Sequence, residues 1–395
     1  MAERFPSNPF GRVGIALSSN VLSRMTDTAA SPFTLVSDPG ATALPMAFNR
    51  LLIVRTSAIG DVVFASPFAA AIKRTYPQAH LAWLVEPGID QLLAADPCID
   101  ELILWPKEEW KRLWAEKRLS ELLRRVGEFR RMLRAKRFDT AIDMQSLLKS
   151  GLLAWLSGAP RRIGLGSREG SRWLMTEVVP KGGVLRRISS EYLYLAERIG
   201  LDKGEFLPRL CIAEATEARA QTLMAEHDLR PRRFAVFAPF TTRPQKHWFE
   251  DAWQTLAQRV RNELGLTPVI LGGSVDREAA ERIAAASPGM AQLAGITRLP
   301  ETAALIRHAG LLVGVDTGLT HMGAAFNTPM VALFGSTRPY LDTCRPNGKV
   351  IWLGLECSPC RRRPTCKGAY PCLRDITPEQ VMAEARSVLA VEPAA

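Results

Sequence analysis

A group of polar residues that follows an apolar run offers the clearest chemistry in this chain. The run extends from Leu311 to Val315, and the residues after it that could act are Asp316, Thr317, Gly318 and His321. Ligands bind at the carboxyl ends of strands in open α/β sheets, and the next helix offers unpaired N–H groups to an anion. Asp316 therefore suits a helix cap, an acceptor of sugar hydroxyls or a bridge through a cation. The alternative is a turn aspartate and a core-facing histidine in an ordinary strand–helix unit.

Two further loops follow apolar runs and carry groups that complement the first. Lys246, Thr241 and Thr242 follow a run that ends at Ala238, and Asp61 follows the first apolar run after residue 50. With a nucleotide-sugar donor, Lys246 and the two hydroxyls could offset the charge of a diphosphate leaving group. Asp61 could accept the proton of an attacking hydroxyl. The alternative for Asp61 is a cap at the start of the next helix.

The elements that must position these groups are buried strands alternating with helices. Continuous apolar runs recur along the chain, each followed by a loop and a helical segment, and this rhythm restarts at Phe234. We therefore predict an α/β protein with two Rossmann-like domains, at residues 48–215 and 216–375, that face each other across a cleft. Residues 1–47 are expected to be a disordered extension. Residues 376–395 are expected to contain a helix that packs back on the N-terminal domain.

The charge balance predicts an acidic partner. Lys and Arg number 51 against 40 Asp and Glu, a net charge of +11, which fits nucleic acid, an anionic membrane face or a phosphorylated substrate. Residues 107–137, interpreted as one helical stretch, carry a basic face that is either solvated or binds a membrane surface or phosphate. No apolar run approaches the ~20 residues that span a bilayer, so a cytoplasmic protein is expected. Neither a Gly-x-Gly-x-x-Gly fingerprint nor a Walker loop is present, which argues against NAD and ATP hydrolysis.

A Gly- and Arg-rich loop is predicted over residues 161–172, and it provides a second set of cations. Arginines in flexible, Gly-flanked positions suit bidentate contacts to carboxylate or phosphate. The arginines concerned are Arg161, Arg162, Arg168 and Arg172.

Four of the seven cysteines cluster near the C-terminus with the spacing C-x2-C-x5-C-x5-C: Cys357, Cys360, Cys366 and Cys372. In a cytoplasmic chain such a cluster favours a structural metal site, for Zn or Fe, over disulfides. Reduced thiols without a metal are the alternative. A catalytic role is not indicated, because no activating base is near in the sequence.

Three motifs together resemble the bacterial heptosyltransferases of glycosyltransferase family nine. They are Leu52–Asp61 (LIVRTSAIGD), Thr241–Trp248 (TTRPQKHW) and Val315–His321 (VDTGLTH), and the resemblance covers essentially residues 51–389. It implies a GT-B fold and transfer of heptose from ADP-heptose to the Kdo region of inner-core lipopolysaccharide, with inversion at the anomeric carbon. The stretch 138–149 looks most like the enzymes that add the first heptose to Kdo.

The resemblance also implies roles for individual residues. Asp61 would be the general base, and Lys246 would offset charge on the ADP leaving group. The implied donor-binding residues are Thr241, Thr242, Lys246, Asp316, Thr317, Gly318 and His321. The implied acceptor-binding residues are Ser57, Gly60, Lys149, Arg161, Arg162, Arg168 and Arg172, whose arginines would meet Kdo carboxylates or lipid A phosphates. The chemistry requires no cofactor, and Mg²⁺ is a candidate at the donor diphosphate.

Two departures from the first-heptose pattern leave alternatives open. Val275 and Asp276 follow Gly272-Gly273-Ser274, where first-heptose enzymes tend to carry Glu, and the Cys-rich tail is similar to those of second-heptose and protein-directed enzymes. The alternatives are therefore a second-heptose enzyme or a protein (autotransporter) O-heptosyltransferase of the same fold.

The implied partners follow from the same resemblance. They are ADP-heptose, Kdo-lipid A and the inner leaflet of the cytoplasmic membrane, where the protein would be peripheral. A nucleic-acid-binding module built on the basic helix and the cysteines is the distant alternative. It lacks the aromatic-interleaved pattern of such proteins, so no nucleic-acid partner is expected.

Overall fold

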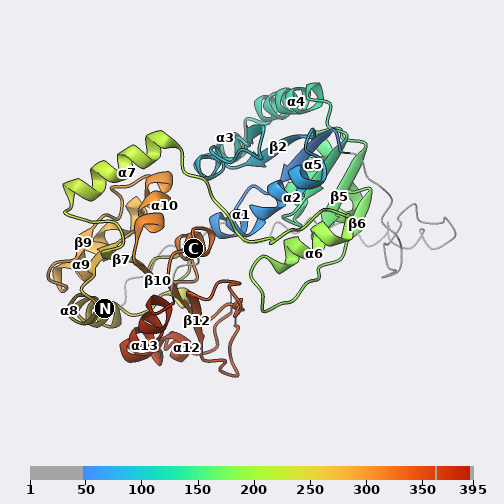
Figure 1. The fold of residues 1–395 in the computed structure, drawn as a ribbon. Helices are drawn as coiled ribbons and strands as arrows, with labels where there is room; N and C mark the ends of the chain where they lie inside the picture. Colours follow the sequence, from blue (N-terminus) through green and yellow to red (C-terminus); the bar gives the residue numbers. More distant parts are fainter. Residues whose placement is uncertain (1–47, 361–362, 392–395) are drawn as a thin grey trace. The chain divides into compact units, whose positions relative to one another are not determined.

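The computed structural model describes residues 48–360 and 363–391 (Figure 1). Its described strands form two six-stranded parallel sheets, in the orders β3-β2-β1-β4-β5-β6 and β12-β11-β10-β7-β8-β9. We call the part with the first sheet the first lobe and the part with the second sheet the second lobe. The two sheets confirm the prediction of two Rossmann-like domains.

The first lobe alternates strands and helices along the chain. Its strands are β1 (Arg50–Val54), β2 (His80–Val85), β3 (Glu101–Leu104), β4 (Thr140–Asp143), β5 (Arg161–Leu165) and β6 (Glu177–Val179). Its helices are α1 (Ile59–Ala65), α2 (Pro67–Thr75), α3 (Lys107–Ala115), α4 (Leu119–Ala135), α5 (Leu148–Leu156) and α6 (Ser190–Arg198), with short 3₁₀ turns η1 (Asp90–Leu92) and η2 (Ser171–Leu174).

The second lobe repeats the pattern. Its strands are β7 (Phe234–Ala238), β8 (Thr267–Ile270), β9 (Ala291–Gln292), β10 (Leu311–Val315), β11 (Met330–Phe334) and β12 (Gly348–Trp352). Its helices are α7 (Glu214–Glu226), α8 (Glu250–Leu264), α9 (Arg277–Ala285), α10 (Leu299–His308), α11 (Gly318–Ala325), α12 (Pro371–Arg374) and α13 (Pro378–Leu389), with 3₁₀ turns η3 (Pro244–Lys246) and η4 (Ser274–Asp276).

The central strands are apolar on both faces because helices cover both sides of each sheet. In β1, Leu51 and Ile53 join the core that α1, α2 and α6 cover, whereas Leu52 and Val54 join the core beneath α4 and α5. All four side chains are fully buried. Burial of each such side chain contributes roughly 1.5–3 kcal/mol, which favours the strand over any exposed alternative.

Strand register brings the predicted loops together at the carboxyl edges of the sheets. In the first sheet, Val54 of β1 pairs with Asp143 of β4. In the second, Ala238 of β7 pairs with Gly314 of β10. The loop after β7 therefore lies beside the loop after β10, as parallel strands require.

Two local expectations were wrong. The stretch 107–137 is two helices, not one, because the chain turns between α3 and α4 and Lys117 takes a positive φ of 56°. The Arg-rich stretch is not loop throughout, since Arg161 begins strand β5. The expected N-terminal extension lies outside the described residues. None of the helices in the described part of the chain is long and apolar enough to cross a membrane.

The C-terminal helix α13 packs on the second lobe, which corrects the expectation that it returns to the first. Its apolar face, Val381, Met382, Ala385 and Val388, is fully buried in the same core as Trp253 of α8. The Thr377 hydroxyl accepts a hydrogen bond from the Gln380 N–H at 3.3 Å and so caps the start of the helix. The helix contacts α8 together with β11 and β12 of the second sheet.

Candidate active site

The predicted donor residues Lys246 and Asp316 meet at the carboxyl edge of the second sheet. The Lys246 Nζ atom lies 2.6 Å from Asp316 Oδ2. Thr337 donates its hydroxyl to the same oxygen at 2.6 Å, and His321 Nε2 lies 3.1 Å from Oδ1. Both carboxylate oxygens are thus engaged by protein donors. The side chains of Lys246 and Asp316 are 15% and 16% exposed, so the pair is shielded but reachable from one side.

The electrostatics of this cluster keep Asp316 ionised. Burial by itself would raise the pKa of Asp316, but the hydrogen bond and charge of His321, together with Lys246, lower the pKa well below its usual range. Thr241 and Thr242 precede Lys246 in the loop after β7, and the Thr241 carbonyl lies 2.7 Å from His247 Nε2. The cluster therefore offers a fixed ammonium group, in the same loop that carries two hydroxyl-bearing residues.

His321 connects this cluster to the first lobe. Its Nδ1 atom lies 2.9 Å from the Tyr340 hydroxyl, and its ring centroid lies 4.4 Å from that of Phe64 in α1. A methyl group added at Gly60 would stand 2.5 Å from the ring, and one added at Gly318 would stand 2.6 Å from Ile59. The amino ends of α1 and α11 are therefore in direct contact. Only glycine fits at these two positions without a shift.

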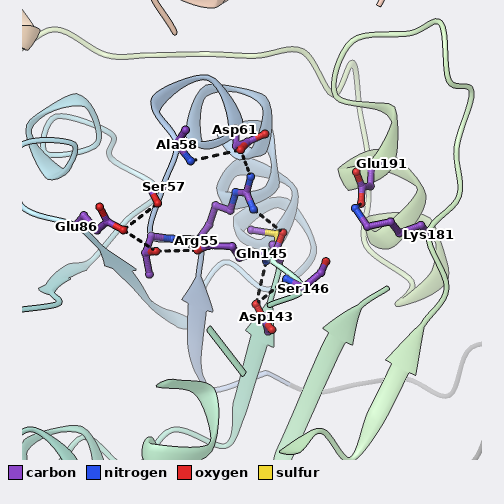
Figure 2. Close-up of polar contacts among 12 residues, drawn as sticks. Arg55, Ser57, Ala58, Asp61, Glu86, Asp143, Gln145, Ser146, Lys181 and Glu191 are labelled. Atoms are coloured by element: carbon purple, nitrogen blue, oxygen red, sulfur yellow. Dashed lines mark hydrogen bonds and ion pairs between the residues drawn. The ribbon is translucent and has the colours of Figure 1, made fainter. Parts of the chain in front are cut away.

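Asp61, the predicted base, forms an ion pair with Arg55 (Figure 2). Asp61 belongs to the first turn of α1, where its carboxylate also faces the Ala58 N–H at 3.4 Å. The N-cap residue is therefore Ala58 and not Asp61, but Asp61 does cap the helix from within its first turn, as the alternative interpretation expected in part. Its side chain is 47% exposed, whereas that of Arg55 is 8% exposed. The carboxylate is thus available to a ligand while its partner stays buried.

The surroundings of Arg55 hold its guanidinium in place beneath Asp61. Its Nη1 donates to the Met144 carbonyl at 3.2 Å, and its Cζ lies 5.9 Å from the centroid of the Tyr192 ring. The Trp83 indole donates to the Arg55 carbonyl at 3.1 Å. Arg55 occurs within the first motif, but nothing in its spacing marked it as the partner of Asp61.

A cavity of about 340 Å³ opens beside the Asp61 carboxylate. Its cationic lining residues are Lys181, Arg187 and Arg338, and Glu191 pairs with Lys181 (Figure 2). The two segments that supply them are joined by backbone hydrogen bonds, including Ile188 N–H to the Asp342 carbonyl at 2.9 Å. These residues come from segments without a motif, so sequence reasoning missed them.

The predicted acceptor residues are not all brought to Asp61. Arg161 and Arg162 lie at the amino end of β5, where Arg161 pairs with Thr140 of β4. The candidate site lies at the other end of these strands, where Gly164 pairs with Asp143. Arg161 makes a two-point ion pair with Glu177, at 2.6 and 2.8 Å. Arg162 donates to the Leu174 and Ala159 carbonyls at 2.7 and 2.6 Å. Both arginines therefore support local structure.

The remaining predicted acceptor residues do not form one cluster either. Gly60 adjoins Asp61. Ser57 donates to Glu86 at 2.9 Å, and Glu86 also binds Lys107 at 2.7 Å. Lys149 lies 5.7 Å from the Trp105 ring centroid. Burial, and then the charge of Lys107, lowers the pKa of Lys149.

Arg168 and Arg172 are both exposed, the first shortly before η2 and the second within it.

The four clustered cysteines follow β12, and they do not form the expected ligand set. Burial, with smaller contributions from the other three thiols, raises the pKa of Cys372 to about 11. Cys357 is exposed whereas Cys372 is buried. Within residues 48–360 and 363–391, no group of three or more His, Cys, Asp or Glu is placed to hold a metal ion. The expected metal site is therefore not assembled among the described residues.

The fold and these loops match one protein family. A model described as glycosyltransferase family 9 (heptosyltransferase) matches residues 126–370, more than half of the chain. The chain belongs to glycosyltransferase family 9. It is therefore a glycosyltransferase, and the family match confirms the resemblance inferred from the three motifs.

Individual members of glycosyltransferase family 9 are similar over most of their length. Lipopolysaccharide heptosyltransferase 1 of Pseudomonas aeruginosa is 28% identical, over 80% of this chain and 87% of that protein. Lipopolysaccharide heptosyltransferase 2 of Salmonella typhimurium is also 28% identical, over 87% and 99%. The solved structure of the E. coli ADP-heptose lps heptosyltransferase II has a TM-score of 0.65 and 26% identity, covering 86% of this chain and 98% of that one. These likenesses confirm the GT-B fold.

Proposed function

We propose that the protein is an inverting heptosyltransferase that moves heptose from ADP-heptose to Kdo in inner-core lipopolysaccharide. The observation that carries the proposal is the cavity beside Asp61, which Arg187 and Arg338 line together with Lys181, itself paired with Glu191. Cations around a carboxylate base suit an acceptor that itself carries carboxylate or phosphate groups. Kdo is a carboxylate sugar, so this lining favours Kdo over a neutral sugar as the acceptor.

The second lobe supports the donor assignment. Lys246 is held at the strand edge by Asp316, and the amino end of α11 lies at the same edge. An ammonium group and a helix amino end both favour a diphosphate. The solved E. coli relative is described as an ADP-heptose enzyme, and we extend that donor to this chain.

The proposed reaction has one base and one leaving group. The acceptor hydroxyl oxygen attacks the anomeric carbon of heptose, and its proton passes to the Asp61 carboxylate. The bond between that carbon and the ADP oxygen breaks on the opposite face, which inverts the configuration. Lys246 and the α11 amide groups then stabilise the charge that develops on ADP. Arg55 holds Asp61 in position and does not touch the reacting atoms.

The geometry also bears on the two metals considered above. Lys246 and Thr337 engage Asp316 Oδ2 and His321 engages Oδ1, so three of the roughly four acceptor sites of the carboxylate are already taken by protein donors and little of it remains for a bridging Mg²⁺ ion. We therefore propose that Lys246, not Mg²⁺, offsets the diphosphate charge. A structural Zn or Fe at the cysteines rests on their spacing alone, and metal analysis of the purified protein tests it.

A transfer assay with alternative acceptors tests the function. ADP-heptose is offered with Kdo-lipid A, with Kdo-lipid A that already carries one heptose, or with a candidate autotransporter protein, and ADP release and product mass are measured. A heptose mass added to Kdo-lipid A is expected. Transfer only to the second or third acceptor would overturn the Kdo assignment, and absence of ADP-heptose binding would overturn the donor assignment. Because lipid A anchors the acceptor, we place the reaction at the inner leaflet of the cytoplasmic membrane.

A further inference from the structure

Helix α5 carries an exposed apolar stripe that the fold does not use. Leu148, Leu152 and Trp155 are 48%, 40% and 40% exposed, and their i, i+4, i+7 spacing places them on one side of the helix. Leu153 and Leu156, in contrast, are buried in the core beneath the helix. The helix is therefore apolar on its outer side as well as its inner side, which the packing of a water-soluble lobe does not require.

Arginines surround this stripe. The Arg130 Cζ atom of α4 lies 5.5 Å from the Trp155 ring centroid. On the other side, η2 packs against α5 so closely that a methyl group at Gly151 would stand 2.8 Å from Ser171 Cβ. There Arg172 lies 5.1 Å from the ring centroid of Trp173, which is 68% exposed.

The surface as a whole is basic. Helices α4 and α5 together with residues 166–174 contain eight Lys or Arg against three Glu. Arg124 and Arg125 pair with Glu128, whereas Arg131, Arg134 and Arg168 are exposed.

We propose that this surface, which we call the α5 docking surface, binds peripherally to an anionic lipid bilayer. Trp and Leu side chains partition into the boundary between lipid headgroups and acyl chains. The long arginine side chains can place their charges at the headgroups while their stems cover apolar surface. Each such charge near an anionic leaflet adds to the attraction, and the attraction falls as salt screens it. A second copy of the chain is a poorer occupant, because pairing two such surfaces would bring like charges together.

The docking surface is linked to the candidate active site by the start of α5. The loop between β4 and α5 contains Gln145, whose Oε1 accepts hydrogen bonds from the Thr56 N–H at 3.0 Å and the Thr56 hydroxyl at 2.8 Å. Thr56 belongs to the loop that leads to Asp61. A bilayer on α5 would therefore lie on the same lobe as the base. This last link rests on the proposed function, in which the acceptor is anchored in lipid, whereas the docking itself does not.

Co-sedimentation with vesicles tests the docking. The full chain is mixed with vesicles of phosphatidylcholine alone or of phosphatidylcholine with phosphatidylglycerol, at low and high salt. We expect binding to the anionic vesicles that weakens with salt. The double variant Leu152→Ser, Trp155→Ser should bind about tenfold more weakly, because it removes the apolar contribution. The double variant Arg131→Gln, Arg134→Gln should lose at least as much affinity for the anionic vesicles.

Matched variants on the second lobe serve as controls. Ile296 is 50% exposed, so Ile296→Ser removes a comparable apolar group, and Arg230→Gln with Arg233→Gln removes two exposed charges. Both controls should bind as the wild type does. Absence of wild-type binding to anionic vesicles, equal binding by the α5 variant, or an equal loss in the controls would overturn the proposal. A dimer that the α5 variant disrupts, without vesicle binding, would overturn it in favour of a second copy.

The same variants separate docking from catalysis. The α5 variant should transfer heptose to a delipidated, water-soluble acceptor at the wild-type rate and to vesicle-embedded acceptor at least about tenfold more slowly. Loss of rate on both acceptors would show a folding or catalytic defect and overturn the assignment of these residues to docking alone. Should the wild type transfer heptose to neither acceptor, the proposed function fails, and the vesicle measurement still decides the docking.

Discussion

His321 lies against Gly60, so closely that a methyl group at that position would stand 2.5 Å from the imidazole Cδ2 atom. His321 cannot easily move away, because Asp316 and Tyr340 engage its two ring nitrogens at 3.1 and 2.9 Å. We therefore expect Gly60→Ala to cost about 1–3 kcal/mol of stability through overpacking. The added methyl group would also push the amino ends of α1 and α11 apart, between Asp61 and the Lys246–Asp316 pair. The rate of transfer should therefore fall at least about tenfold.

The glycine at position 127 provides the control for this variant. It lies inside α4, and a methyl group there meets no atom within 4 Å. Gly127→Ala should therefore leave transfer unchanged and stabilise the chain by up to about 1 kcal/mol through helix propensity. Denaturant unfolding and initial-rate measurements on both variants check the pair. Equal effects of the two substitutions would show that the Gly60–His321 contact has no special role.

Replacement of the proposed base should separate chemistry from donor binding. Asp61→Asn keeps the size of the side chain but removes the proton acceptor, so kcat should fall by about 10²–10⁴. Titration calorimetry should find ADP affinity unchanged, since the donor residues lie on the second lobe. Asp202→Asn is the matched control, because Asp202 also faces an arginine, Arg74 at 3.9 Å, at a 61% exposed position. A variant at position 61 that keeps the wild-type kcat would refute the assignment.

Arg55 should act through Asp61 and not through substrate. Its guanidinium contacts both the Met144 carbonyl and the Asp61 carboxylate, and a lysine has one nitrogen with which to replace this fork. Arg55→Lys should therefore lower kcat by about ten- to a hundredfold with little change in KM. Arg55→Met should lower it further and also destabilise the fold. If Arg55→Lys changes KM and leaves kcat intact, Arg55 contacts substrate instead.

Acid should weaken the second lobe through Asp316. Its folded-state pKa lies below the unfolded value of about 3.9. Ionised Asp316 therefore stabilises the fold above about pH 4, and this contribution is lost as the pH falls through the lower folded value. We expect Asp316→Asn to be less stable than the wild type at neutral pH, with the gap narrowing below about pH 4. Urea unfolding across this range measures the gap, and a gap independent of pH would contradict the assignment.

Chelation should leave the chemistry intact. Because protein donors engage both oxygens of Asp316, transfer should persist in excess EDTA at close to the untreated rate. Lys246→Ala, in contrast, should lower kcat by at least about a hundredfold, since it removes the cation proposed to face the diphosphate. Loss of activity in EDTA that Mg²⁺ restores would assign that charge to a metal ion.

Much of the fold could be predicted because buried parallel strands leave a strong mark on the sequence. Leu51–Val54 and Leu311–Val315 are continuous apolar runs, and the polar residues after each run lie at the sheet edges as expected. The sequence predicted that Lys246 and Asp316 both bind the donor, but it did not predict that they contact each other. Their direct contact depends on β7 lying next to β10, and strand order is a long-range property that single runs do not encode.

The cavity, the position of Arg161 and the break between α3 and α4 could not be predicted, because they depend on contacts or turns that leave no pattern in the nearby sequence. Lys181, Arg187 and Arg338 meet at the cavity because backbone hydrogen bonds join segments more than 150 positions apart. Arg161 belongs to a Gly- and Arg-rich stretch of the sequence, yet it lies at the amino end of β5, where Glu177 neutralises it. The turn at Lys117 contains neither Gly nor Pro. The sequence therefore shows no break in the helical pattern there, and one helix was predicted in place of two.

The packing of α13 on the second lobe affects when each lobe can fold during synthesis of the chain. The strands of the lobe that carries Asp61, and its core down to Phe206, precede the whole second lobe, so the first lobe can fold while the ribosome is still adding the remainder. The second lobe cannot, because its core needs Val381, Met382, Ala385 and Val388 from the last described helix. A premature stop shortly before Pro378 would leave a finished first half attached to a second half with an open core, which cellular proteases would recognise.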